Sequence, residues 1–281
     1  MSSTLPKLAA AVAAAALASA CLLLPDAGDK PGWRSGPDLA AGGDAAADTV
    51  AVPATGTGLF KTVRLRSGGA LTLENDYGDV EIAGWERETV EVAVTAAARA
   101  PEVEIRETEA GVLVRTRTYE GAGAPPETSF KVRVPAFVDL AGIRISEGDL
   151  AVSGVRGRLE ASVDKGDLSV TDFSGSVNVS VGTGRADVEV LRPRDADTVT
   201  ILSRKGDIVL RLERGTGAIV EADASRGVRS DFDLGVRLPL PAVKGWIGQG
   251  GPNIILRASD GRIDILSVGD GTGTARPAKG Q

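Results

Sequence analysis

The sequence of 281 residues contains no histidine, which removes the commonest general base and the commonest metal ligand of enzymes. Its single cysteine allows neither an intrachain disulfide nor a thiolate metal cluster. Aromatic residues make up only 4% of the chain, and the net charge of −6 arises from interspersed acids and bases. No basic patch therefore predicts a nucleic-acid partner. We also find no Gly-Lys-Ser/Thr phosphate loop, and we predict no catalytic residue, no cofactor and no metal site.

The chain begins with a segment typical of an export signal. Lys7 precedes an uncharged apolar run from Leu8 to Leu24, and Ala18-Ser19-Ala20 matches an A-x-A cleavage site. We therefore predict a signal peptide over residues 1–24. Residues 25–58 and 269–281 are rich in small and polar residues, so we expect a disordered linker and a disordered tail.

Cys21 directly follows the small residues of this cleavage site, and the arrangement resembles the lipobox of bacterial lipoproteins. The resemblance implies that Cys21 is a lipidation site, which would tether the protein to a membrane. The lipobox leucine is displaced, because Ala18 stands three residues before the cysteine and Leu17 four residues before it. Two other interpretations stay open: an incidental cysteine in an alanine-rich run, and an uncleaved signal that itself serves as the tether.

From about residue 59 the sequence alternates between apolar and polar residues, which predicts an all-β fold. Its centre adds a repeat, because glycines recur every nine residues and are followed at +2 and +4 by apolar residues. The distance from each glycine to the third apolar position alternates between two values. The true period is therefore two nine-residue units, which is 18 residues. These turn glycines, for which we predict positive φ angles, are Gly148, Gly157, Gly166, Gly175 and Gly184, with Gly206 resuming the rhythm after an insertion.

A period of 18 residues predicts a parallel β-solenoid (a β-helix) in which each coil has two short strands and two turns. Equivalent apolar residues would stack on one another about 4.8 Å apart. Residues 85–135 break the rhythm and predict an irregular antiparallel segment near the N-terminal end. Within it, Val103–Ile105 and Val112–Thr118 predict a hairpin. At the other end, Pro239, Pro241, Trp246 and Ile247 predict a cap.

Two groups of residues have alternative interpretations. Asp149, Asp167 and Asp207 each follow a turn glycine, so they are either calcium ligands of a stacked repeat or polar turn residues. We favour turn residues, because the calcium-binding nonapeptide pattern is absent. Trp85 and Trp246 are either core residues at the two ends or exposed anchors for a ligand.

The units GALTLENDYGDVEIAGW, EGDLAVSGVRGRLEASVDKGDLSV and VKGWIGQGGPNIILRASDGRIDIL resemble the putative-adhesin family of exported bacterial β-strand-repeat proteins. This family is related to the head domain of autotransporter adhesins. The resemblance covers about residues 60–268. It implies one adhesin-like β-solenoid domain, over residues 59–268, that is right-handed and lies in the cell envelope. Its motifs are structural, so no catalytic residue is carried over.

These observations predict a non-enzymatic, exported protein of the bacterial cell envelope, either on the cell surface or in the periplasm. It would present a β-solenoid surface for adhesion, or for binding an envelope polymer such as a polysaccharide, or a protein partner. One alternative is a periplasmic accessory protein of envelope stress or assembly. A second is a polysaccharide-degrading β-helix enzyme, which short coils and minimal outer loops disfavour.

Overall fold

The computed structural model describes residues 48–50, 59–65, 68–96, 103–116 and 127–268. The predicted signal peptide, Cys21 and most of the predicted linker and the whole predicted tail lie outside these residues.

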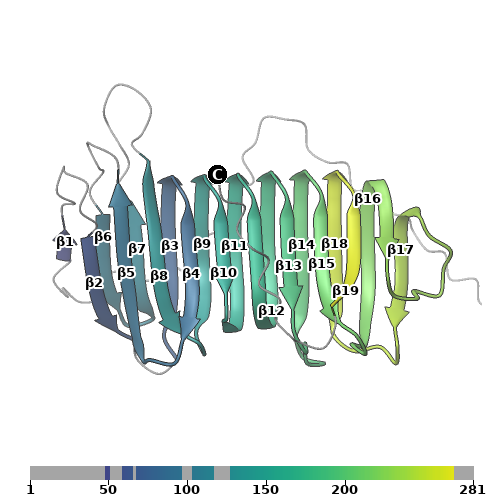
Figure 1. The fold of residues 1–281 in the computed structure, drawn as a ribbon, viewed down its shortest axis with the longest axis horizontal. Helices are drawn as coiled ribbons and strands as arrows, with labels where there is room; N and C mark the ends of the chain where they lie inside the picture. Colours follow the sequence, from purple (N-terminus) through teal and green to yellow (C-terminus); the bar gives the residue numbers. More distant parts are fainter. Residues whose placement is uncertain (1–47, 51–58, 66–67, 97–102, 117–126, 269–281) are drawn as a thin grey trace, which may run out of the picture. The chain divides into compact units, whose positions relative to one another are not determined.

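The described residues form strands joined by turns and loops, which confirms the predicted all-β fold (Figure 1). In chain order the strands are β1 (Asp48–Val50), β2 (Leu59–Arg64), β3 (Ala70–Tyr77), β4 (Val80–Trp85), β5 (Thr89–Ala96), β6 (Val103–Thr108), β7 (Gly111–Thr116), β8 (Thr128–Pro135), β9 (Asp139–Glu147), β10 (Leu150–Ser153), β11 (Arg156–Lys165), β12 (Leu168–Thr183), β13 (Ala186–Val190), β14 (Thr198–Lys205), β15 (Ile208–Glu213), β16 (Ala218–Ser230), β17 (Leu240–Ile247), β18 (Asn253–Asp260) and β19 (Ile263–Val268).

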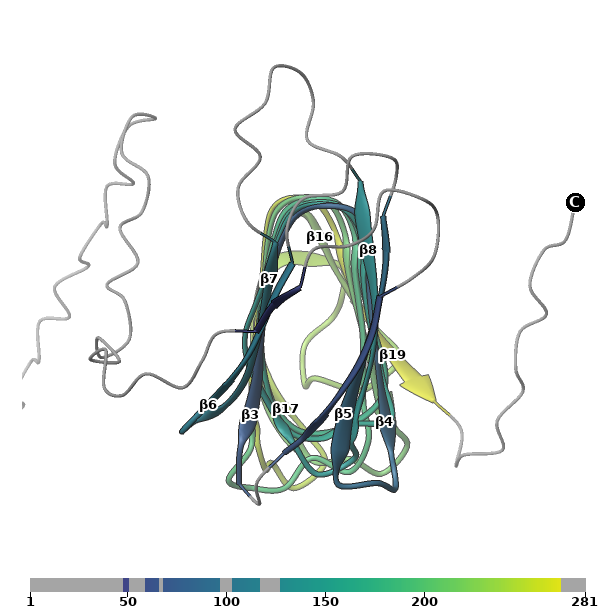
Figure 2. The ribbon, with the colours of Figure 1, turned by 90° about the vertical axis from the view of Figure 1, so that its left-hand side faces the viewer.

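These strands face each other in two layers, which Figure 2 shows end on. The first layer follows the pairings β1–β6–β7–β3–β9–β11–β12–β14–β18–β16–β17. The second follows β2–β5–β8–β4–β10–β12–β13–β15–β19–β16. Strands β12 and β16 belong to both layers because their two halves pair on opposite sides.

The predicted right-handed β-solenoid of 18-residue coils is wrong. Seven parallel strands close a ring of hydrogen-bonded pairs, β12–β14–β18–β16–β19–β15–β13 and back to β12. The result is a closed parallel barrel with the remaining strands bonded outside it. The closure depends on the length of β12 and β16, with 16 and 13 residues, since each passes from one layer to the other.

The 18-residue rhythm still describes which residues are lateral neighbours. Leu150 pairs with Leu168, and Leu168 pairs with Ala186. A period therefore gives the pairing register, whereas it carries no information on how the pairs close around the molecule. The predicted hairpin is confirmed, because β6 and β7 pair antiparallel through a turn at Glu109 and Ala110.

A continuous apolar core fills the space between the two layers. Alternate residues of nearly every strand point into it, and many of them are fully buried, with Phe130 and Phe173 the largest. Each fully buried valine, leucine, isoleucine or phenylalanine side chain contributes about 1.5–3 kcal/mol when it leaves water. The residues between them point outward and form the outer faces of the two layers.

The C-terminal end of the core is closed differently from the prediction. Ile247 is 4% exposed, as expected for a plug, but Trp246 is 66% exposed and points outward. The loop between β16 and β17 supplies the plug instead, because Leu234 is 3% exposed within the core cluster. Gly245 permits this, since a Cβ there would lie 2.4 Å from the Leu234 carbonyl oxygen.

Candidate functional site

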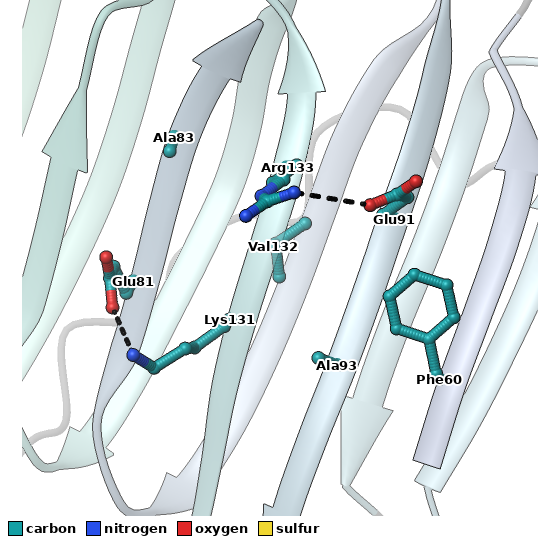
Figure 3. A pocket seen from close by; sticks show the side chains of 8 residues that line it. All are labelled: Phe60, Glu81, Ala83, Glu91, Ala93, Lys131, Val132 and Arg133. Atoms are coloured by element: carbon teal, nitrogen blue, oxygen red, sulfur yellow. Dashed lines mark ion pairs between the residues drawn. The ribbon is translucent and has the colours of Figure 1, made fainter. Parts of the chain in front are cut away.

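The candidate site is a shallow hollow on the outer face of the second layer, over strands β2, β5, β8 and β4 (Figure 3). Its volume is about 280 Å³. The residues that line it are Phe60, Glu81, Ala83, Glu91, Ala93, Lys131, Val132 and Arg133. They come from four separate strands and are brought together by lateral pairing.

Strand register explains why these residues share a face. Phe60 pairs with Ala93, Ala93 with Lys131, and Lys131 with Glu81, so the four stand in one row across the sheet. A second row contains Glu91, Arg133 and Ala83. Side chains alternate between the two faces of a strand, and the inward-facing members are valines such as Val63 and Val92.

The hollow forms because small residues stand between large ones. Ala93 separates Phe60 from Lys131, and Ala83 lies beside Arg133. Phe60 is 62% exposed, so most of its ring is available to a ligand. An exposed aromatic ring beside a floor of methyl groups can pack against the apolar face of a ligand.

Paired charges form the rim. The Lys131 Nζ lies 3.2 Å from a carboxylate oxygen of Glu81, and a guanidinium nitrogen of Arg133 lies 3.8 Å from Glu91. Arg87 approaches the same Glu91 at 3.7 Å. The Lys131–Glu81 pair is exposed on both sides and contributes little to stability, whereas Glu91 is only 15% exposed between its two arginines. These pairs place hydrogen-bond donors and acceptors of both signs around an apolar floor, which suits a ligand rich in hydroxyl groups.

Trp85 lies at the end of β4 and is half-buried. Its indole Nε1 donates a hydrogen bond of 2.8 Å to the Thr89 carbonyl oxygen, which fixes the ring. The guanidinium groups of Arg87 and Arg133 lie 4.8 and 5.8 Å from the ring centroid. Trp85 therefore orients the two arginines that also pair with Glu91, and it is neither a fully buried core residue nor a free anchor.

A second exposed aromatic ring stands apart from the hollow. Phe137 follows β8 and is 75% exposed, and the guanidinium of Arg156 lies 5.4 Å from its centroid. Phe137 does not line the hollow. It therefore provides a matched comparison for Phe60 when binding is tested.

The six turn glycines predicted from the sequence all have positive φ angles, between +130° and +157°. Gly148, Gly166, Gly184 and Gly206 lie between strands, whereas Gly157 and Gly175 lie within β11 and β12. None of them lines the hollow. Their role in the structure is to let the chain turn and pack closely.

The aspartates that follow these glycines act as turn residues. The Asp149 Oδ1 accepts a 2.8 Å hydrogen bond from the Asp167 backbone N–H, and the Asp167 Oδ1 accepts one of 2.7 Å from Arg185. Asp207 accepts from the Arg262 N–H at 2.9 Å in the same manner. Among the described residues, no group of three or more acids forms a cluster that could hold a metal ion.

A buried ionic cluster lies in the first layer, on β6 and β7. The Glu104 side chain is 1% exposed, and its two oxygens accept hydrogen bonds of 2.6 and 2.7 Å from Arg106 and Arg115. Burial by itself raises the pKa of Glu104, but the two arginines outweigh it and lower that pKa below its ordinary value. This cluster holds neighbouring strands together and lies in the other layer from the hollow.

Sequence reasoning missed the residues of the hollow. The phase of the alternation contained a signal, because Val63 points inward and so Phe60 must point outward. The sequence held no signal that strands β2, β5, β8 and β4 are adjacent, since their pairing joins residues up to 50 positions apart, as in Lys131 and Glu81.

Within the described part of the chain, no helix is long and apolar enough to span a membrane.

No protein-family model matches the chain, and no curated protein matches it either. Solved structures are similar to it. A putative cell adhesion protein from Clostridium sporogenes has a TM-score of 0.43 and 15% identity, over 76% of this chain and 100% of that one. A putative adhesin from Parabacteroides distasonis has a TM-score of 0.26 and 12% identity, over 76% and 98%. A putative adhesin from Bacteroides fragilis has a TM-score of 0.25 and 8% identity, over 76% and 99%.

These neighbours are named as putative adhesins or as a putative cell adhesion protein, which is the family that the sequence motifs resemble. Their names describe adhesion or adhesins and contain no enzyme activity.

Proposed function

We propose that this chain is a non-enzymatic binding protein, exported to the bacterial cell envelope, whose hollow around Phe60 binds a carbohydrate segment of an envelope or extracellular polymer. The exposed Phe60 ring beside an alanine floor is the observation that carries the proposal. Export rests on the features of residues 1–24 described above.

The shape of the hollow supports a polymer as the ligand. It opens onto the broad outer face of the second layer, so a chain can enter and leave along the sheet (Figure 3). An aromatic ring can stack on the C–H face of a sugar, and the pairs Lys131–Glu81 and Arg133–Glu91 offer both donors and acceptors to hydroxyl groups. Among the residues that line the hollow, Glu81 and Glu91 balance Lys131 and Arg133, which favours a neutral polysaccharide over a strongly acidic one.

Binding of purified protein to a panel of neutral and acidic bacterial polysaccharides tests the proposal. Stacking on one ring contributes about 0.5–1.5 kcal/mol, so Phe60→Ala should weaken binding of a neutral polysaccharide by about twofold to tenfold. Isothermal titration calorimetry or affinity electrophoresis would measure the change.

Phe137→Ala is the matched control, since it removes an exposed phenylalanine outside the hollow and should leave affinity unchanged. Equal losses in the two variants, or no binding to any polysaccharide of the panel, would contradict the proposal.

A further inference from the structure

Strand β17 forms the end of the first layer and has one bare edge. It pairs antiparallel with β16, with Trp246 opposite Ile219 and Lys244 opposite Glu221. Within the described ranges, no other strand pairs with it. An edge of this kind presents unpaired backbone N–H and C=O groups, which another strand can satisfy.

The outer face of this edge is apolar. Trp246 is 66% exposed and its cross-strand neighbour Ile219 is 44% exposed. The inner face is already closed, because Leu234 and Ile247 fill the end of the core. A partner therefore has no core to complete, and it needs only to supply a strand and to cover the exposed indole.

We propose that the partner is a second copy of this chain, and that two β17 strands pair antiparallel about a two-fold axis at Gly245. This inference goes beyond the proposed function and does not depend on it. In an antiparallel pair of strands, inward residues must lie opposite inward residues. The two-fold axis must therefore pass through a single residue and not between two residues. A centre at Lys244 would place two ammonium groups opposite each other.

The centre at Gly245 brings complementary residues together. It places Lys244 of each copy opposite the partner's Trp246 on the outer face, where an ammonium group can lie over an indole ring. On the inner face it places Val243 opposite Ile247. The pairing uses residues 243–247 and so avoids Pro241, whose ring nitrogen cannot donate a ladder bond.

The existing contacts of Lys244 do not oppose this arrangement. Its Nζ lies 3.7 Å from Glu221, and Arg257 lies 3.6 Å from the same carboxylate. Glu221 therefore keeps a cationic partner when Lys244 turns towards the partner's indole. Because both copies use the same strand, the interface is isologous and closes as a dimer rather than growing into a fibre.

Sedimentation velocity over a range of protein concentrations tests this proposal. The wild-type protein should form a dimer. Trp246→Lys places a lysine opposite Lys244 and should weaken dimerisation at least tenfold. Trp246→Glu removes the same ring but places a carboxylate opposite Lys244, so it should retain the dimer far better than Trp246→Lys.

Leu202→Lys is the control, because Leu202 is 39% exposed on β14 in the same layer but away from the edge. It should leave the dimer intact, and equal melting temperatures would show that all variants are folded. A wild-type monomer at every concentration, equal dissociation of both Trp246 variants, or dissociation of the Leu202 variant would each overturn the proposal.

Discussion

Glu104 shows how one residue can be buried and yet remain charged. Its neighbours Val103 and Ile105 face the core, so alternation turns the Glu104 side chain to the opposite side of β6. There Arg106 and Arg115 hold it with short hydrogen bonds while they stay 40% and 43% exposed. The cost of burying the carboxylate is offset because both of its oxygens have cationic donors.

The lowered pKa of Glu104 predicts a specific dependence of stability on pH. Its folded pKa lies below its unfolded value, so its contribution is complete above about pH 4.5 and is lost as pH falls through the folded pKa. Glu104→Gln should therefore reduce the free energy of unfolding by about 1–2 kcal/mol at pH 7. The difference from wild type should shrink below pH 4.5.

Urea denaturation between pH 7 and pH 3 would measure both effects. Glu81→Gln is the control, because Glu81 is 56% exposed beside Lys131 and its loss should cost less than about 0.5 kcal/mol. Parallel pH profiles for wild type and Glu104→Gln would contradict the assignment.

At the scale of elements, the turns form a ladder that ties successive strands together. The Gly148 N–H donates to the Lys165 carbonyl oxygen and the Gly166 N–H donates to the Thr183 carbonyl oxygen, both at 2.9 Å. Asp149 and Asp167 add side-chain bonds to the next turn, as described above. Each turn therefore depends on its neighbours for satisfied backbone groups.

Close packing in this ladder predicts that its glycines cannot be replaced. Gly166 has a φ of +139°, and a Cβ there would lie 2.0 Å from the Gly148 carbonyl oxygen. Gly166→Ala should lower the free energy of unfolding by at least about 2 kcal/mol, because both strain and a backbone clash arise. Chemical denaturation measures the loss.

Gly215→Ala separates the two causes. Gly215 has a φ of +85° with nothing within 4 Å of the added Cβ, so only conformational strain remains. That variant should lose about 1 kcal/mol. Equal losses at Gly166 and Gly215 would show that the close contact has no energetic consequence.

At the scale of the whole molecule, the location of the protein in the cell envelope is linked to its function. A carbohydrate-binding face is useful for adhesion only where the polymer is outside the cell, whereas an accessory protein of envelope assembly would act in the periplasm. Both roles need only a folded binding surface, so the structure of the described residues is compatible with either. The location of the chain therefore decides between the two.

Accessibility on intact cells provides this test. With a tag at the C-terminus, we expect antibody or protease added outside to reach the protein without permeabilisation. Comparison with permeabilised cells gives the total amount, and a known periplasmic protein gives the background. A signal that appears only after permeabilisation would favour the periplasmic alternative.

The sequence by itself determined the all-β class, the alternation of inward and outward residues along the strands and the register that joins Leu150 to Leu168. These properties follow from local causes, namely side-chain alternation and the recurrence of glycine. Only the tertiary structure decided that β12 and β16 pass between layers and close the barrel, because closure depends on which strand ends meet. It also decided the hollow, since Phe60, Ala93, Lys131 and Glu81 become neighbours only through the lateral pairing of strands that are distant in sequence.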